Sequence, residues 1–251
     1  MNINKVADLH IGLSDAIHIL GKDPLINGFS VGNIPNQFDI FRARSSDLAL
    51  FGAFMCPIGF TKDERVYLPI DQKFEIGQHI KVINEFARNS EFKIIKNNHS
   101  IARNNKGLFI GLEGVYFLKA LKDLDFLYEL IANDVRVIAP LWNYKSNLFT
   151  DNNVSSLGME FLKVCYQNDI VIDLAHTESS VDLAIIKKYD GRIINSHTAI
   201  FELNNYKRNI RLEVANEIRR RRGLIGIAFI SDFIGGNQIE DLANHVVREL
   251  N

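Results

Sequence analysis

Seven short apolar runs alternate with longer segments of helical periodicity along almost the whole chain of 251 residues. Each run is continuously apolar, as in strands that are buried on both faces of a parallel sheet. The intervening segments place apolar residues at three- and four-residue spacing, which is typical of amphipathic helices. The predicted strands are 5–12, 48–57, 107–115, 135–142, 170–176, 192–199 and 224–230, and the predicted helices are 72–90, 121–134, 155–169, 179–190, 212–223 and 238–251.

This alternation predicts an α/β fold, and the number of units favours a TIM-type (β/α)8 barrel over a small doubly wound domain. The barrel is expected to be truncated after the seventh βα unit, because the last predicted helix ends with the chain. With no internal repeat and no Pro/Gly-rich linker, residues 1–251 are expected to form a single barrel domain. Residues 21–37 lack a clear period and are predicted to form a long loop.

The net charge, the cysteines and the absence of targeting signals limit the expected binding partners and cellular location of the protein. A formal net charge of -1 argues against nucleic acid or an acidic membrane as a partner, and the basic run 219–222 is interpreted as the solvated end of a helix. Cys56 and Cys165 stand in apolar surroundings without Cys-x-x-Cys spacing, which predicts buried thiols in a reducing compartment. With neither a signal-peptide pattern nor 18 consecutive apolar residues, the chain is expected to be cytoplasmic.

Four of the predicted strands end on a potential metal ligand. His10, Glu113, His176 and His197 each stand at the end of a different strand. The carboxyl ends of barrel strands meet on one face, so these side chains are expected to converge. A single histidine at such a place is more often a hydrogen-bonded loop residue. Three imidazoles and a carboxylate at equivalent positions, however, form a ligand set suited to a divalent metal such as zinc.

Two aspartates and four further histidines are less informative. Asp8 and Asp173 lie near the strand ends and could either orient a ligand histidine or accept hydrogen bonds from loop amides. The remaining histidines fall in helical or loop stretches and are interpreted as surface or capping residues: His18, His79, His99 and His245.

Taken together, the motifs resemble the renal or membrane dipeptidase family of the amidohydrolase superfamily, over about residues 8–247. The stretch "DLHIG" is similar to the family's Asp-Gly-His-Asn-Asp segment, and "GLEG" is similar to its Glu-Gly. "IDLAHTES" resembles its Asp-x-Ser-His segment, "NSHTAI" its Ser-His-Ser segment and "KRNIRLEV" its Arg-Asn segment. The two later histidine motifs with the following Arg-Asn are fairly specific in combination, whereas each alone is a weak signal.

The resemblance implies a barrel of the metal-dependent hydrolase kind that binds two zinc ions and cleaves dipeptides or related small amides. It makes Glu113 the bridging carboxylate and catalytic residue, His176 and His197 the other ligands of one metal, and His10 a ligand of the second. Arg208 resembles the arginine that binds the carboxylate end of a dipeptide. That role also suits its chemistry, because a guanidinium group can bind a carboxylate through two hydrogen bonds.

This sequence departs from the family pattern at three places. Gly12 stands where the family has an aspartate ligand, so the second metal site loses a side chain, and Asp15 is the nearest carboxylate that could replace it. Trp142 stands at the substrate-binding position where the family has a histidine that polarises the scissile carbonyl. The family's Asp-Phe-Asp-Gly motif on strand eight is absent. Loss of a positioned acid or base typically costs about 10²- to 10⁴-fold in rate.

Three hypotheses therefore stay open. The first, which we favour, is a zinc metallo-dipeptidase that holds one or two ions and acts on a small dipeptide-like substrate. The second is a catalytically impaired relative that binds a metal or a small carboxylated ligand. The third is one part of a split enzyme. An unclosed parallel sheet has exposed edges, so closure could come from a partner chain, from a second copy in a homo-oligomer, or from an N-terminal segment.

Overall fold

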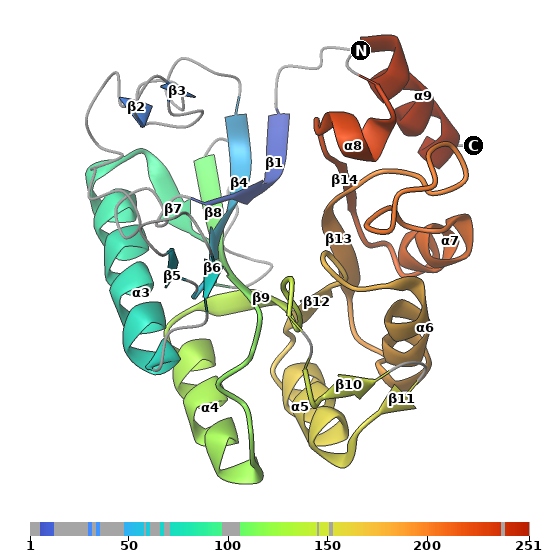
Figure 1. The fold of residues 1–251 in the computed structure, drawn as a ribbon. Coiled ribbons are helices and arrows are strands. Elements are labelled where there is room, and N and C mark those ends of the chain that lie inside the picture. The colour runs from blue at the N-terminus through green and yellow to red at the C-terminus, as the bar shows by residue number, and fades with distance from the viewer. Residues whose placement is uncertain are drawn as a thin grey trace. The chain divides into compact units, whose positions relative to one another are not determined.

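The computed structural model describes residues 6–12, 30–31, 34–35, 48–57, 59–60, 66–67, 71–96, 106–144, 146–150, 153–236 and 239–250 (Figure 1). The chain divides into two compact units. The N-terminal unit comprises Met1–Phe117 with Asp125–Arg136, and the C-terminal unit comprises Leu118–Leu124 with Val137–Asn251.

The N-terminal unit is built on three parallel strands in the order β1 (Val6–Ile11), β4 (Leu48–Met55) and β8 (Lys106–Glu113). A short strand that the sequence pattern did not predict, β7 (Phe92–Ile94), pairs in parallel with β8. The long helix α3 (Gln72–Asn89) packs against β4 and β7. It begins where the Asp71 carboxylate accepts a hydrogen bond from the Phe74 N–H at 2.9 Å, as an N-cap does.

Aromatic side chains fill the core of this unit. Phe51 on β4, Phe86 on α3 and Phe92 on β7 are fully buried, and the rings of Phe51 and Phe92 meet edge to face with centroids 4.9 Å apart. Such pairs add about 0.5–1.5 kcal/mol to the area that they bury. Helix α4 (Leu124–Ala132) buries Leu127 and Leu130 and completes the unit.

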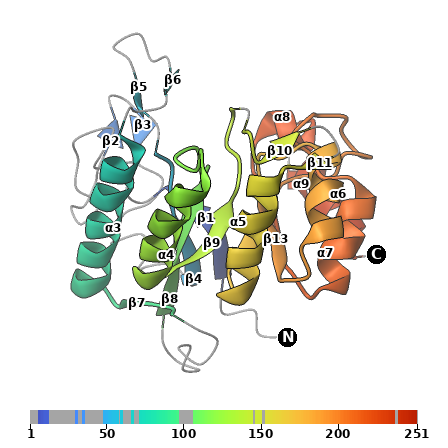
Figure 2. The same cartoon turned by 90° about the horizontal axis from the view of Figure 1, so that it is seen from below.

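The C-terminal unit continues the alternation of parallel strands and helices. Its strands are ordered β9 (Val135–Ala139, belonging to this unit from Val137), β12 (Val171–Asp173), β13 (Ile193–Thr198) and β14 (Ile225–Ile227). Its helices are α5 (Ser156–Gln167), α6 (Ser179–Lys188), α7 (Leu212–Arg220), the short α8 (Ser231–Ile234) and α9 (Ile239–Leu250). Helices α6 and α7 lie side by side, as Figure 2 shows, and α7 packs on β13.

Short elements complete the description. Two-stranded antiparallel pairs form between β2 (Ser30–Val31) and β3 (Ile34–Pro35), between β5 (Gly59–Phe60) and β6 (Val66–Tyr67), and between β10 (Phe149–Thr150) and β11 (Asn153–Val154); a 3-10 helix, η1, spans Leu121–Asp123. The pair β2–β3 falls within the loop predicted for 21–37, and the rest of that loop lies outside the described residues.

All seven predicted strands and all six predicted helices are present, and among the described residues the elements that the pattern missed are two to four residues long. Such segments carry too few residues to show a period. The two cysteines are buried, as expected. Within the described part of the chain, no helix is long and apolar enough to cross a membrane.

The basic run 219–222 was interpreted as the solvated end of a helix, and for Arg221 this is wrong. Its side chain is only 12% exposed and forms an ion pair with Glu217 at 2.6 Å. It also donates to the carbonyl oxygens of Ile186 at 2.8 Å and of Tyr189. Arg221 therefore ties the end of α7 to the end of α6, where unpaired helix carbonyls need donors.

Two of the histidines interpreted as surface or capping residues are buried instead. His79 on α3 is fully buried, and His245 on α9 is 2% exposed. The Nδ1 atom of His245 accepts the Ile200 N–H at 2.9 Å, and its Nε2 lies 3.2 Å from the Ile234 carbonyl oxygen. His245 thus satisfies two backbone groups at once, because imidazole offers one donor and one acceptor. His18 and His99 lie outside the described residues.

Candidate metal centre

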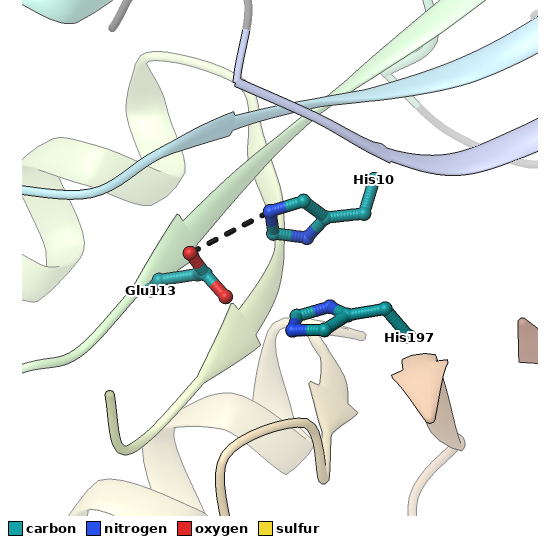
Figure 3. Close-up of side chains that lie close together, drawn as sticks. All are labelled: His10, Glu113 and His197. Carbon is teal, nitrogen blue, oxygen red and sulfur yellow. Dashed lines mark ion pairs between the residues drawn. The ribbon is translucent and has the colours of Figure 1, made fainter. Parts of the chain in front are cut away.

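The N-terminal unit brings two of the predicted ligands together. His10 lies near the end of β1 and Glu113 is the last residue of β8, and Nε2 of His10 is 3.5 Å from Oε2 of Glu113 (Figure 3). The His10 ring stacks on Phe54 with centroids 4.2 Å apart. The Asp8 carboxylate accepts a hydrogen bond from the His10 backbone N–H at 3.0 Å, so it fixes the backbone of the histidine.

Glycines make the close packing around Glu113 possible. Gly114 has φ +84°, a left-handed conformation that side chains other than hydrogen disfavour. A Cβ atom at Gly111 would lie 2.6 Å from the Phe54 ring, the ring on which His10 stacks. The sequence "GLEG" is therefore required for the local geometry, and Glu113 itself is 4% exposed.

In the C-terminal unit, one aspartate supports the backbone before both remaining histidines. Asp173, fully buried at the end of β12, accepts hydrogen bonds through Oδ1 from the N–H groups of Ala175 at 3.0 Å and Ser196 at 2.9 Å. These residues immediately precede His176 and His197. Of the two interpretations of Asp173 left open by the sequence, the structure shows the bonding of loop amides.

The two histidines face each other from neighbouring strands. His197 lies within β13, whereas His176 lies three residues beyond the end of β12 in a left-handed conformation with φ +68°. Their Nε2 atoms are 3.0 Å apart. A non-glycine residue held at positive φ is uncommon and is often part of a functional site.

Asn143 and Arg208 surround this pair. The Oδ1 atom of Asn143 lies 3.0 Å from Nδ1 of His176 and accepts a hydrogen bond from Nη1 of Arg208, also at 3.0 Å. Nη2 of Arg208 is 3.3 Å from Nε2 of His197, and Nδ1 of His197 is 3.0 Å from the Ser196 hydroxyl. The guanidinium group also lies over the Phe233 ring, 5.6 Å from its centroid.

The contacts with Arg208 assign some of the donor and acceptor roles. Arginine has only donors, so both the Asn143 oxygen and Nε2 of His197 must accept from it. Nδ1 of His197 therefore carries the proton of that ring and donates to Ser196. For His176, the Asn143 oxygen favours a proton on Nδ1, whereas the contact with Nε2 of His197 favours a proton on Nε2.

The Nε2 atoms of His176 and His197 lie 3.0 Å apart, and Nε2 of His197 also lies 3.3 Å from Nη2 of the Arg208 cation. Two imidazole ligands of a tetrahedral zinc, with bonds of about 2.0–2.1 Å, have nitrogens roughly 3.3 Å apart. Burial, and secondly the charge of Arg208, lower the pKa of His176 to about 2, so this imidazole is neutral at pH 7 as a metal ligand must be. The donor set of the C-terminal unit therefore fits a zinc ion.

Aromatic residues flank the cluster. The Trp142 ring lies 5.8 Å from the His176 ring and 5.9 Å from the ring of Tyr144. Trp142 thus stands beside a predicted ligand, consistent with its predicted place at the site. Gly12, directly after β1, offers no side chain, and Asp15, the predicted replacement, lies outside the described residues.

The sequence did not single out Asn143 and Ser196, although each contacts a predicted ligand. Asn143 follows the end of β9 by four residues, so the rule that selected the histidines would also have found it. Ser196 could be located only from the orientation of the His197 ring.

Comparison with known proteins agrees with this fold. A curated relative, an uncharacterised dipeptidase of Schizosaccharomyces pombe, is 23% identical over 167 residues, which cover 61% of this chain and 38% of that protein. The chain thus spans well under half of that relative's length.

Two solved structures cover 98% of the chain. One is a metallopeptidase from Rhodobacter sphaeroides bound to a phosphinate mimic of the dipeptide L-Ala-D-Ala, with a TM-score of 0.81, 15% identity and 82% of that chain covered. The other is the dipeptidase AC, a metallopeptidase of family M19, with a TM-score of 0.79, 16% identity and 80% of that chain covered. At this identity the likeness establishes the fold, and it confirms the predicted α/β barrel of TIM type.

The family profile of membrane dipeptidase, peptidase family M19, matches residues 3–248. The match spans nearly the whole chain and includes every motif on which the resemblance was based. The chain therefore belongs to the membrane dipeptidase family.

Proposed function

We propose that the protein is a metal-dependent hydrolase that cleaves dipeptides or related small amides. Membership of a metallo-dipeptidase family supports the class of reaction. The single observation that carries the proposal is the pair of Nε2 atoms of His176 and His197 that lie 3.0 Å apart, with Arg208 beside them. Such a pair suits a metal, and the guanidinium group suits the carboxylate end of a small peptide.

In this proposal His176, His197 and Glu113 hold a zinc ion, and His10 contributes to a second one. Residues 1–251 act as one barrel domain in this proposal. A bound zinc would lower the pKa of its water to about 7 and polarise the substrate carbonyl. Asn143 would hold the His176 imidazole, and Asp173 would fix the backbone that precedes both histidines through the N–H groups of Ala175 and Ser196.

Arg208 is proposed to bind the free carboxylate of the substrate. Its Nη1 and Nη2 atoms already point to acceptors in the site, so a carboxylate could take both hydrogen bonds in a bidentate arrangement. Trp142 would form a wall of the same binding site next to His176.

A second candidate, a relative that binds a metal or small carboxylated ligand without turnover, rests on Gly12 and Trp142. Gly12 removes a ligand, and Trp142 cannot protonate or polarise a carbonyl as a histidine can. Both candidates share the same metal-binding residues, so only turnover separates them. We place the protein in the cytoplasm, which suits the two buried thiols.

The deciding experiment is elemental analysis of protein purified without added metal, with dipeptide hydrolysis assayed on the same sample. The expected result is about one zinc or more per chain, with turnover that a chelator abolishes and zinc restores. Zinc without turnover of any dipeptide or amidated analogue would favour the second candidate. Protein that neither retains zinc nor binds it on addition would refute both.

A further inference from the structure

Asn143 forms hydrogen bonds to two side chains that have different proposed roles. One oxygen, Oδ1, accepts from Nδ1 of His176 and from Nη1 of Arg208, each at 3.0 Å. An amide oxygen has two lone pairs, so both bonds can form together. The first partner is a proposed metal ligand, and the second is the proposed carboxylate binder.

The bond to His176 has a chemical consequence. A neutral imidazole carries one proton and can place it on either nitrogen. An acceptor next to Nδ1 keeps the proton there and leaves the Nε2 lone pair directed toward Nε2 of His197. If this acceptor were lost, the proton could move to Nε2, where it would form a hydrogen bond to His197 and block ligation.

The bond to Arg208 has a geometric consequence. A free arginine side chain populates many rotamers, and an acceptor in the site reduces their number before the substrate arrives. Asn143 holds Nη1, while Nη2 lies 3.3 Å from Nε2 of His197. The guanidinium plane is thus oriented by partners on two different segments of the C-terminal unit.

We propose that Asn143 is a positioning residue that sets the tautomer of His176 and the orientation of Arg208, so that metal binding and carboxylate recognition depend on one side chain. This inference rests on the proposed function for its metal and its carboxylate. The tautomer assignment can nevertheless be tested in metal-free protein.

The first test is nitrogen NMR of histidine-labelled, metal-free protein near pH 7. The wild type is expected to show His176 protonated at Nδ1, with the resonance assigned through His176→Gln. Asn143→Ala is expected to shift the proton toward Nε2, whereas Asn143→Asp, which still offers an acceptor, keeps it on Nδ1. An unchanged tautomer in Asn143→Ala would overturn the proposal, whatever the protein binds.

The second test is zinc titration by calorimetry. Asn143→Ala is expected to weaken zinc binding about 10- to 100-fold, as loss of groups that orient metal ligands typically does. Asn143→Asp should restore most of the affinity. Asn147→Ala, an exposed asparagine in the same loop, is the matched control and should leave the affinity unchanged. Equal loss in both alanine variants would overturn a specific role for Asn143.

The third test concerns Arg208. The ratio of kcat/KM for a dipeptide to that for its C-terminal amide is expected to fall in Asn143→Ala, although Arg208 is intact. An unchanged ratio would refute the effect on Arg208. Failure of wild-type protein to bind zinc or to cleave dipeptides would count against the proposed function, and the NMR result would still decide the role of Asn143.

Discussion

The two units hold their proposed ligands in different ways. In the N-terminal unit, the His10 ring lies between an ion-pair contact with Glu113 and a stacked phenylalanine. In the C-terminal unit, hydrogen bonds run continuously from Ser196 through His197 and Arg208 to Asn143 and His176. The second arrangement constrains the donor and acceptor roles of the side chains as well as their positions, because each side chain has a hydrogen-bond partner.

This difference suggests a division of tasks between the units. The C-terminal cluster is organised for ligation before a metal arrives, and an organised site loses little entropy on binding. The N-terminal pair adds negative charge and an imidazole, but Gly12 removes a further ligand on its side. Metal affinity should accordingly depend more strongly on the C-terminal residues.

The largest effect is expected from removing the facing imidazoles. The double variant His176→Ala/His197→Ala should lose zinc entirely, because it lacks both facing Nε2 atoms. His10→Ala should retain about one zinc per chain, since it removes only the proposed ligand of the second ion. Elemental analysis after dialysis measures both, with circular dichroism to check folding. Undiminished zinc in the double variant would exclude this site.

The next largest effect is expected for binding of the substrate carboxylate by Arg208 in the C-terminal cluster. Arg208→Ala should weaken binding of dipeptides with a free carboxylate about 10- to 100-fold, since hydrogen bonds to charged groups contribute about 1.5–3 kcal/mol. C-terminally amidated analogues should lose much less. Inhibition of dipeptide hydrolysis by each of the two series of compounds measures the two losses in affinity. Parallel losses for both would argue that Arg208 acts only through its contacts with Asn143 and His197.

The free energy of unfolding is expected to depend on pH through a buried carboxyl group next to the C-terminal cluster. Asp182 on α6 contacts the hydroxyl of Thr177, the residue after His176. Burial raises the pKa of Asp182 to about 7, and the Thr177 hydrogen bond opposes this to a smaller extent. Between about pH 4 and 7 the unfolded chain releases this proton while the folded protein keeps it, so the contribution of Asp182 to the free energy of unfolding falls as pH rises.

The variant Asp182→Asn should therefore lose less stability than wild type between pH 4.5 and 7.5. Urea denaturation at several pH values measures the difference in slope. Asp190→Asn, at an exposed carboxylate just after the same helix, is the matched control and should follow wild type. Identical slopes for Asp182→Asn and wild type would show that Asp182 is not protonated in the folded state.

The smallest changes in stability are expected from one glycine-to-alanine substitution in a helix of each unit. Gly77 on α3 has open space where a Cβ atom would lie, so Gly77→Ala should stabilise the protein by about 0.5–1 kcal/mol. Gly158 on α5 has the Leu148 carbonyl oxygen 2.3 Å from that position, so Gly158→Ala should destabilise it by about 1–3 kcal/mol. Urea midpoints test the opposite signs, and two changes of the same sign would contradict the packing described here.

Periodicity predicted the main strands and helices because each lies in a stretch long enough to display an apolar pattern. This holds even for the three-residue strands β12 and β14, which lie within longer apolar runs. The three-residue strand β7 lies in a shorter run, and it forms because it pairs with β8. Burial was harder to predict for polar residues. Arg221 and His245 are buried because backbone carbonyl and amide groups from distant segments need partners there, and nothing in the local sequence reveals such a need.

The same distinction applies to the site. The sequence by itself determined which residue types stand at the strand ends, since strand periodicity and the polar residues that follow it are local features. His10, Glu113, His176 and His197 were therefore found. Only the tertiary structure decided that the oxygen of Asn143 joins His176 to Arg208 and that the Nε2 atoms of His176 and His197 face each other. Hydrogen-bond roles depend on which atoms meet, and these contacts join residues that are 21 to 65 positions apart in the chain.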